Sequence, residues 1–247
     1  MRRHGLLGYR ASRIVQNAGK RITGLLLAML LVAAVCYMLF GKDSSVGVFA
    51  EHSPAIRGVD TEEDVYSVTV LLDGVSESDL RLLLEAFAGY GIKATFFVDA
   101  AWASAHNEFC VSLAADHALA LLVKTDFSRF SRAEVMNYVA VLNDKFMTAT
   151  GVYPKYVRYV GNGEGYLPAV LSSYGQYYIS AEATMTNTAV QVRAGAILEV
   201  VPCGDDTLFA LAGTAATAVA NSLSPVPLSE LLYPAGSEVN ANGYQYK

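Results

Sequence analysis

The chain has 247 residues, of which 53% are hydrophobic, and its formal net charge at pH 7 is −5. All 23 acidic residues but only 12 of the 18 basic residues lie after residue 40, so residues 41–247 carry a net charge of −11. This charge argues against binding to nucleic acid or to anionic polymers, and three cysteines are too few for a disulfide framework.

An uncharged stretch at residues 22–40, ITGLLLAMLLVAAVCYMLF, is the strongest local signal. As a helix rising about 1.5 Å per residue, it is long enough to cross the roughly 30 Å hydrocarbon core of a bilayer. Residues 1–21 contain basic but no acidic residues, which predicts a cytoplasmic N-terminus and an extracytoplasmic C-terminal part. The alternative is a signal peptide cleaved after Ala50, but the stretch exceeds the about 7–15 apolar residues typical of such signals. We therefore predict an uncleaved, single-pass transmembrane helix.

The rest of the chain alternates between two patterns. Residues 41–64 are polar and turn-rich, which is typical of a linker. Apolar segments typical of buried strands then alternate with helical patterns, two of which begin at capping-box serines, Ser76 and Ser131. The predicted strands are residues 65–72, 93–98, 117–123, 155–160, 176–180 and 196–201. The predicted helices follow Ser76 and Ser131 and lie near 103–114, 165–174, 206–221 and 228–232.

This alternation predicts an α/β fold with a mostly parallel sheet, because the strands are too apolar to face water on either side. Such sheets, open or closed into a barrel, bind ligands at the carboxyl ends of their strands. Asp73 directly follows strand 65–72 and is therefore a candidate site residue. The Asp73-Gly74 pair is also typical of an ordinary turn.

Five segments in order and spacing resemble the polysaccharide deacetylases, the NodB-homology domain of carbohydrate esterase family 4. They are VTVLLDGV (68–75), IKATFFV (92–98), DHALALLVKTD (116–126), TGVYPKYVR (150–158) and LSELL (228–232). The resemblance implies a distorted (β/α) barrel of about seven strands, which we place at residues 65–235, with a C-terminal tail at 236–247. Active members of this family remove acetyl groups from N-acetylated sugar polymers.

The resemblance also implies a site with zinc or another divalent metal, held by one aspartate and two histidines. Asp73 corresponds to the metal-binding aspartate, and Arg158 to the arginine that orients the catalytic base. The other key positions are lost. Leu72 stands for the base, Leu122 and Asp126 stand for the two metal histidines, and Val201 stands for the catalytic histidine. We therefore expect no resident metal, and Arg158 either pairs with Asp73 in the former cleft or is a solvated strand-end arginine.

Three functional hypotheses follow. The leading one is an inactive, membrane-anchored deacetylase-like protein that binds cell-wall glycan or an envelope protein. The second is an active hydrolase with displaced ligands, drawn from Asp73, Asp126 and Asp116 or His117. The third is a structural or assembly protein of the envelope. Tyrosines between 153 and 178 either stack on sugar rings or simply cover the barrel.

Overall fold

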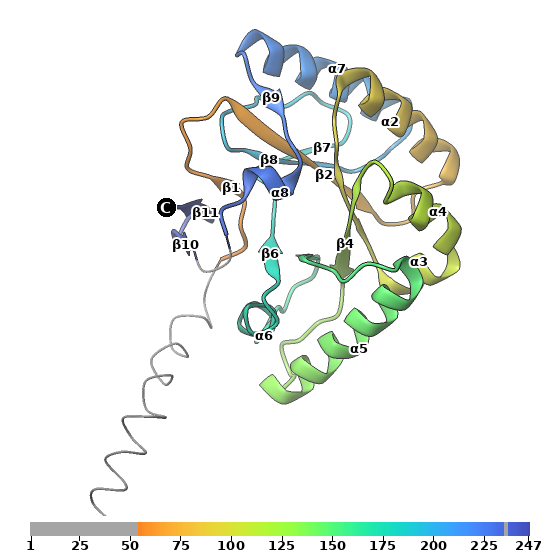
Figure 1. Ribbon diagram of the computed structural model, residues 1–247, viewed down its shortest axis with the longest axis vertical. Helices are drawn as coiled ribbons and strands as arrows, with labels where there is room; N and C mark the ends of the chain where they lie inside the picture. The colour runs from red at the N-terminus through yellow and green to blue at the C-terminus, as the bar shows by residue number, and fades with distance from the viewer. Residues whose placement is uncertain (1–53, 235–236) are drawn as a thin grey trace, which may run out of the picture. The chain divides into compact units, whose positions relative to one another are not determined.

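The computed structural model describes residues 54–234 and 237–247, which form a domain built on one curled sheet (Figure 1). The predicted cytoplasmic segment 1–21, the transmembrane helix 22–40 and most of the linker 41–64 lie outside the described residues. Within the described ranges, no helix has the length and apolar character needed to cross a membrane.

Seven parallel strands form the main sheet of the described part, in the order β6-β5-β4-β3-β2-β8-β7. They are β2 (Val65–Leu72), β3 (Thr95–Val98), β4 (Ala118–Val123), β5 (Tyr156–Tyr159), β6 (Tyr177–Ile179), β7 (Ala183–Met185) and β8 (Ile197–Val200). The sheet curls into a half-barrel, which agrees with the predicted (β/α) barrel. Strand β7 was not predicted, because ATM is a short segment between turn-rich stretches, with no helical pattern on either side.

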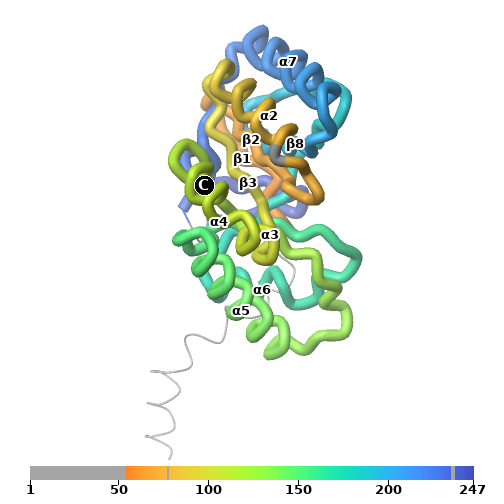
Figure 2. Tube along the Cα trace, turned by 90° about the vertical axis from the view of Figure 1, so that its right-hand side faces the viewer, coloured from red at the N-terminus to blue at the C-terminus, as the bar shows by residue number. Residues whose placement is uncertain are grey.

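Most of the helices cover the outside of the sheet, whereas the last one packs on its concave side, and they sit near the predicted positions (Figures 1 and 2). They are α2 (Glu77–Tyr90), α3 (Ala100–Ala105), α4 (Asn107–Leu113), α5 (Arg132–Thr150), α6 (Leu167–Ser173), α7 (Asp205–Ala220) and α8 (Leu228–Leu231). The Ser131 hydroxyl and the Glu134 carboxylate cap α5 reciprocally, as a capping box predicts. Ser76 caps α2 by accepting the Asp79 N–H, so the predicted helix starts are confirmed. The single helix expected near 103–114 is two short helices, α3 and α4, separated at His106.

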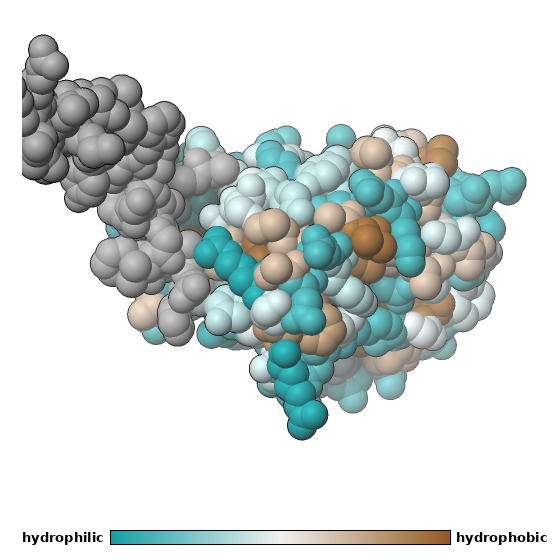
Figure 3. All heavy atoms as spheres, turned by 90° about the horizontal axis from the view of Figure 1, so that it is seen from below, coloured by the Kyte–Doolittle hydropathy of each residue, from teal (hydrophilic) through white to brown (hydrophobic). Residues whose placement is uncertain are grey.

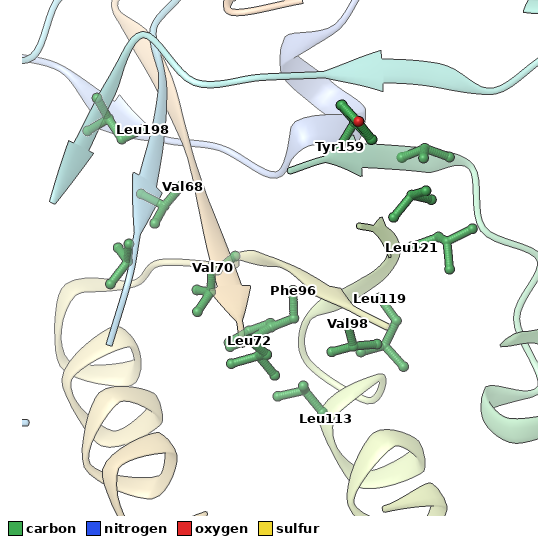
Figure 4. Close-up of a cluster of buried hydrophobic side chains, with 14 of the residues drawn as sticks. Val68, Val70, Leu72, Phe96, Val98, Leu113, Leu119, Leu121, Tyr159 and Leu198 are labelled. Carbon is green, nitrogen blue, oxygen red and sulfur yellow. The ribbon is translucent and has the colours of Figure 1, made fainter. Parts of the chain in front are cut away.

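The sheet separates two hydrophobic clusters, because successive residues of a strand point to opposite faces. The outer cluster lies between the sheet and the helices, and Figure 4 shows Val68, Val70 and Leu72 of β2 within it. The inner cluster fills the concave side. Its buried residues are Ile56, Val59, Phe97, Ala120, Leu122, Tyr156, Ile179, Ile197, Leu228 and Leu231. The half-barrel is therefore packed on its inside.

On the face shown in Figure 3, hydrophilic residues surround small, separate hydrophobic areas. Such a distribution is normal for a folded domain that packs its large apolar side chains inside.

A second, three-stranded sheet joins the two ends of the described chain. It consists of β1 (Gly58–Val59), β11 (Tyr244–Tyr246) and β10 (Glu238–Val239), and it lies outside the predicted domain limits of 65 and 235. The short strand β9 (Ser224–Pro225) extends the main sheet beside β2.

The segment around β1 links two separate strands of the half-barrel. Ile56 exchanges backbone hydrogen bonds with the β6 region, and Ile197 at the start of β8 donates its N–H to the Arg57 carbonyl. Gly195 makes this crossing possible, since its φ is +75° and a Cβ atom there would lie 1.9 Å from the Val59 carbonyl oxygen. Residues 54–60 therefore belong to the folded domain.

We predict that Gly195→Ala lowers the free energy of unfolding by more than about 3 kcal/mol, because the left-handed backbone alone costs about 1–2 kcal/mol and β1 must also move. Gly74→Ala is the matched control, with φ of +70° but no atom within 4 Å of an added Cβ. It should cost only the backbone penalty of about 1–2 kcal/mol. Urea unfolding measures both values, and equal losses would show that the β1 crossing is not a tight contact.

Candidate functional site

Three charged residues meet at the carboxyl edge of the sheet. Asp73 directly follows β2, Asp99 follows β3, and Lys124 follows β4. These strands are neighbours and parallel, so their carboxyl ends lie at one edge. The structure therefore places Asp73 at the edge where ligand sites of parallel sheets occur.

Lys124 bridges the two carboxylates. Its Nζ atom lies 2.9 Å from Asp73 Oδ1 and 3.3 Å from Asp99 Oδ2. The hydrogen bond to Asp73 is the main cause of a raised pKa of Lys124, and Asp99 adds to it. The ammonium group therefore stays charged at neutral pH, which makes Lys124 a poor nucleophile or base.

Asp99 is held in place by a second interaction. Its Oδ1 atom accepts the N–H of Trp102 at 2.7 Å and so caps α3, while Oδ2 faces Lys124. The carboxylate is thus fixed at a helix start, where negative charge is favourable. We define Asp73, Asp99 and Lys124 as the charged triad.

Arg158 does not pair with Asp73, and it is not a solvated arginine. Its guanidinium binds Glu199 of β8 in a bidentate manner, with Nε–Oε2 at 2.8 Å and Nη2–Oε1 at 3.1 Å. It also donates to Ser180 Oγ at 2.8 Å. The two side chains are only 16% and 5% exposed, so this ion pair lies inside the half-barrel. Both expectations for Arg158 are therefore wrong, because Glu199 was not considered as a partner.

The remaining positions implied by the resemblance take no part in the ion pairs of the charged triad. Leu72 is buried in the outer cluster, on the face of β2 that packs against helices (Figure 4). Leu122 is buried in the inner cluster. Asp126 is exposed and accepts the Ser128 N–H at 2.9 Å, which lowers the pKa of its carboxyl group. Val201 follows β8, and its N–H donates to the Met185 carbonyl.

These residues do not fit the divalent metal that the resemblance implies. Metal sites of this kind need several carboxylate or imidazole ligands around one point. The Asp73 carboxylate already binds an ammonium group, and Leu122 has no donor atom. In the described ranges, no three His, Cys, Asp or Glu side chains are placed to hold a metal.

The displaced-ligand set also does not converge. Asp116 and His117 precede β4, whereas Asp126 follows it and Asp73 follows the parallel strand β2. Strand β4 has six residues, at about 3.3 Å each, so Asp116 and His117 lie about 20 Å from Asp126 and Asp73, at the opposite edge of the sheet. This set of ligands therefore cannot form one metal site.

A cavity of about 530 Å³ opens beside the charged triad, between α3 and α5. Asp99 and Lys124 line it together with Ser104, Thr125, Tyr138 and Lys145. Thr125 Oγ1 and Tyr138 Oη are hydrogen-bonded at 2.6 Å, which fixes two hydroxyl groups at the wall. We call this the edge cavity. It presents hydroxyl, carboxylate and ammonium groups beside an aromatic ring, which are the groups that bind neutral sugars.

Most of the tyrosines considered for sugar stacking are structural. Tyr156 and Tyr159 are buried, and Tyr178 donates to Glu164. Tyr153 and Tyr166 are exposed, at 46% and 39%, and Tyr166 follows the carboxyl end of β5. Only Tyr166 therefore combines exposure with a place near the carboxyl edge.

The described domain has the fold of polysaccharide-deacetylase domains, as solved structures of family 4 carbohydrate esterases show. A pseudoenzyme of that family from Bacillus anthracis has a TM-score of 0.62 and 14% identity, over 79% of this chain and 74% of the other. A mutant of that pseudoenzyme with restored enzymatic activity also has a TM-score of 0.62, at 16% identity.

Structures of family 4 enzymes share this fold as well. A family 4 carbohydrate esterase from Streptomyces lividans, in complex with acetate, has a TM-score of 0.59 and 19% identity, over 70% of this chain and 97% of the other. A peptidoglycan N-acetylglucosamine deacetylase has a TM-score of 0.61 and 12% identity, over 74% and 95%. At these identities the similarity establishes the fold, so the resemblance seen in the sequence is confirmed at that level. No protein-family model and no curated protein matches the sequence.

Sequence reasoning missed three residues of the site. Asp99 and Lys124 each come directly after a predicted strand, which is the same signal that singled out Asp73. Glu199 is a carboxylate inside the apolar segment AILEVV, and a buried charge requires a partner. Arg158 is likewise a charged residue inside an apolar segment, KYVRYV, and so also requires a partner. The two segments are far apart in the sequence, so only the fold could show that they pair.

We predict that Glu199→Leu lowers the free energy of unfolding by about 3 kcal/mol or more, because it leaves the Arg158 guanidinium largely buried without its anion. The double variant Arg158→Met/Glu199→Leu should recover most of this loss. Urea unfolding of the wild type, both single variants and the double variant gives the coupling energy. Additive losses below about 1 kcal/mol each would contradict a structural role of the ion pair.

Proposed function

We propose that this chain is a catalytically inactive, membrane-anchored polysaccharide-deacetylase-like protein that binds a neutral N-acetylated cell-wall glycan at the edge cavity. The observation that carries the proposal is the ammonium group of Lys124, which bridges Asp73 and Asp99 where the resemblance expects a metal. The carboxylate that would hold a cation is thus already neutralised by a side chain of the protein itself.

Three further observations support loss of activity with retention of binding. Leu72 and Leu122 are buried apolar residues, so the positions of the base and of one metal histidine carry no proton acceptor or ligand. The solved structures of similar fold include both a peptidoglycan N-acetylglucosamine deacetylase and a pseudoenzyme. The edge cavity, finally, is large enough for a sugar and has polar groups at its wall.

The charge of the chain favours a neutral glycan over an anionic polymer. Residues 41–247 carry a net charge of −11, which repels phosphate-rich polymers at long range. An N-acetylated sugar has no charge and offers hydroxyl and amide groups to Lys124, Lys145 and Tyr138.

One experiment tests both parts of this proposal. The full chain is incubated with N-acetylated chitooligosaccharides and with peptidoglycan fragments, and bound sugar, released acetate and protein-bound zinc are measured on the same samples. We expect binding without acetate release and without stoichiometric zinc. Tyr138→Phe and Lys145→Ala should each weaken binding several-fold, because each removes a hydrogen-bonding group from the edge cavity.

The controls test the inactive assignment and the glycan-binding assignment separately. Lys93→Ala, at the opposite edge of the sheet, should bind sugar like the wild type. Acetate release that Asp73→Ala abolishes would show an active enzyme and overturn the inactive assignment. Absence of sugar binding in the wild type would instead overturn the glycan-binding assignment.

Anchoring rests on the apolar stretch 22–40 and on the basic residues before it. We expect the full chain to stay in the membrane fraction after an alkaline wash, at its uncleaved mass of 26.5 kDa. Ala50→Tyr, which would block signal peptidase, should differ from the wild type only by the mass of the substitution, because both chains stay uncleaved. A mature protein in the soluble fraction that begins after Ala50 would contradict the anchor.

A further inference from the structure

A second cavity, of about 450 Å³, lies at the amino edge of the sheet, between α2 and α4. Its apolar wall comes from Leu84 and Phe87 of α2 and from Phe109 and Leu113 of α4. Its polar groups are Lys93, which precedes β3, and Asp116 and His117, which precede β4. We call it the amino-edge pocket. It lies about 20 Å from the charged triad, a distance set by the length of β4.

The two charged residues of this pocket have no ionic partner within the described part of the chain. Lys93 and Asp116 are exposed, and neither takes part in an ion pair among the residues that the structure describes. Both act on His117, Asp116 raising its pKa and Lys93 lowering it, so charges of opposite sign lie near the same ring. The pocket thus combines one cation and one anion with an apolar wall.

His117 supplies a fixed hydrogen-bond donor. Its Nδ1 atom accepts the Ala94 N–H at 3.2 Å, and its ring packs edge-to-face on Phe96 with 5.2 Å between the ring centroids. A neutral imidazole that accepts at Nδ1 carries its proton on Nε2. Burial lowers the pKa of His117, so this neutral form predominates at pH 7.

We infer that the amino-edge pocket binds a zwitterionic α-amino acid with an aromatic or large aliphatic side chain. The Lys93 ammonium and His117 Nε2–H bind its carboxylate, and the Asp116 carboxylate binds its ammonium group. The apolar side chain lies against Leu84 and Phe109, the partly exposed apolar residues of the wall, where contact with the Phe109 ring favours an aromatic group. A ligand with only one charge, or with no apolar part, satisfies only some of these groups.

The charged and apolar groups of the amino-edge pocket together determine which ligand fits it. An uncharged apolar molecule would leave both Lys93 and Asp116 unused, and a fatty acid would bring its carboxylate close to Asp116. A cavity of this size is at the lower end of the range for small-ligand sites, which suits a single amino acid. This inference does not depend on glycan binding at the edge cavity.

Calorimetric titration of the full chain with L-phenylalanine tests the inference. Three related compounds each lack one feature: N-acetyl-L-phenylalanine has no ammonium group, L-phenylalaninamide has no carboxylate, and glycine has no apolar side chain. We expect each to bind about tenfold more weakly than L-phenylalanine, because each leaves one part of the pocket without its partner.

Two variants identify which residue recognises which group. Lys93→Ala should weaken L-phenylalanine binding about tenfold and remove its advantage over L-phenylalaninamide, because the carboxylate then has lost its cation. Asp116→Ala should do the same and remove the advantage over N-acetyl-L-phenylalanine. Both residues are exposed, so neither change should unfold the protein. Lys145→Ala, in the edge cavity, is the matched control and should leave the affinity unchanged.

Two results would overturn the inference. One is the absence of any binding of L-phenylalanine up to about 10 mM. The other is equal affinity for L-phenylalanine and its two blocked forms, which would show that apolar contact alone drives binding. Ser112→Trp, which fills the pocket from α4, checks the location, since binding that survives it occurs elsewhere.

Discussion

The curl of the main sheet is the constraint on which the rest of the structure depends, and the ion pair of Arg158 on β5 with Glu199 on β8 exists because of it. Three strands separate these two in the sheet, so in a flat sheet they would lie about 19 Å apart. A contact of 2.8 Å between Nε and Oε2 is possible only because the sheet curls until β5 and β8 face each other. Burying two charges is costly unless each hydrogen-bonding group finds a partner. Ser180 and Thr184 supply additional partners, so the polar centre is compatible with the packed inner cluster around it.

The carboxyl edge of the sheet places a charged residue at the end of each of three neighbouring strands. A positive charge near the carboxylate at the end of β2 is favourable, and either a metal or an ammonium group can supply it. Lys124 supplies the charge from the end of β4, and Asp99 shares it. An ammonium group has no open coordination position and cannot activate water, whereas a metal can do both. The ammonium group of Lys124 can therefore balance the charge of Asp73 at the strand end, but it supplies none of the water activation that a metal would.

Much of the fold follows from local sequence patterns, whereas the pairings do not. Ser76 and Ser131 mark helix starts through their own hydroxyl groups, so a few neighbouring residues determine them. The apolar character of VYSVTVLL and HALALLV indicates buried strands for the same local reason. Arg158 was assigned the wrong partner because its choice between Asp73 and Glu199 depends on the curl of the whole sheet. Residues 54–60 were taken as linker because their contacts are with segments such as 195–197 and 243–245, which are distant in the sequence.

The two edges of the sheet then differ in a way that bears on function. At the carboxyl edge, Lys124 is shared between Asp73 and Asp99, so the triad offers no free cation, and we propose that a ligand there binds mainly through hydroxyl groups and ring surfaces. At the amino edge, Lys93 and Asp116 have no partner among the described residues, so a ligand that carries both charges would gain from each. A neutral sugar suits the first edge and a zwitterion suits the second. Since about 20 Å of packed β4 separates them, the two sites can be occupied together, and substitutions at one should leave binding at the other unchanged.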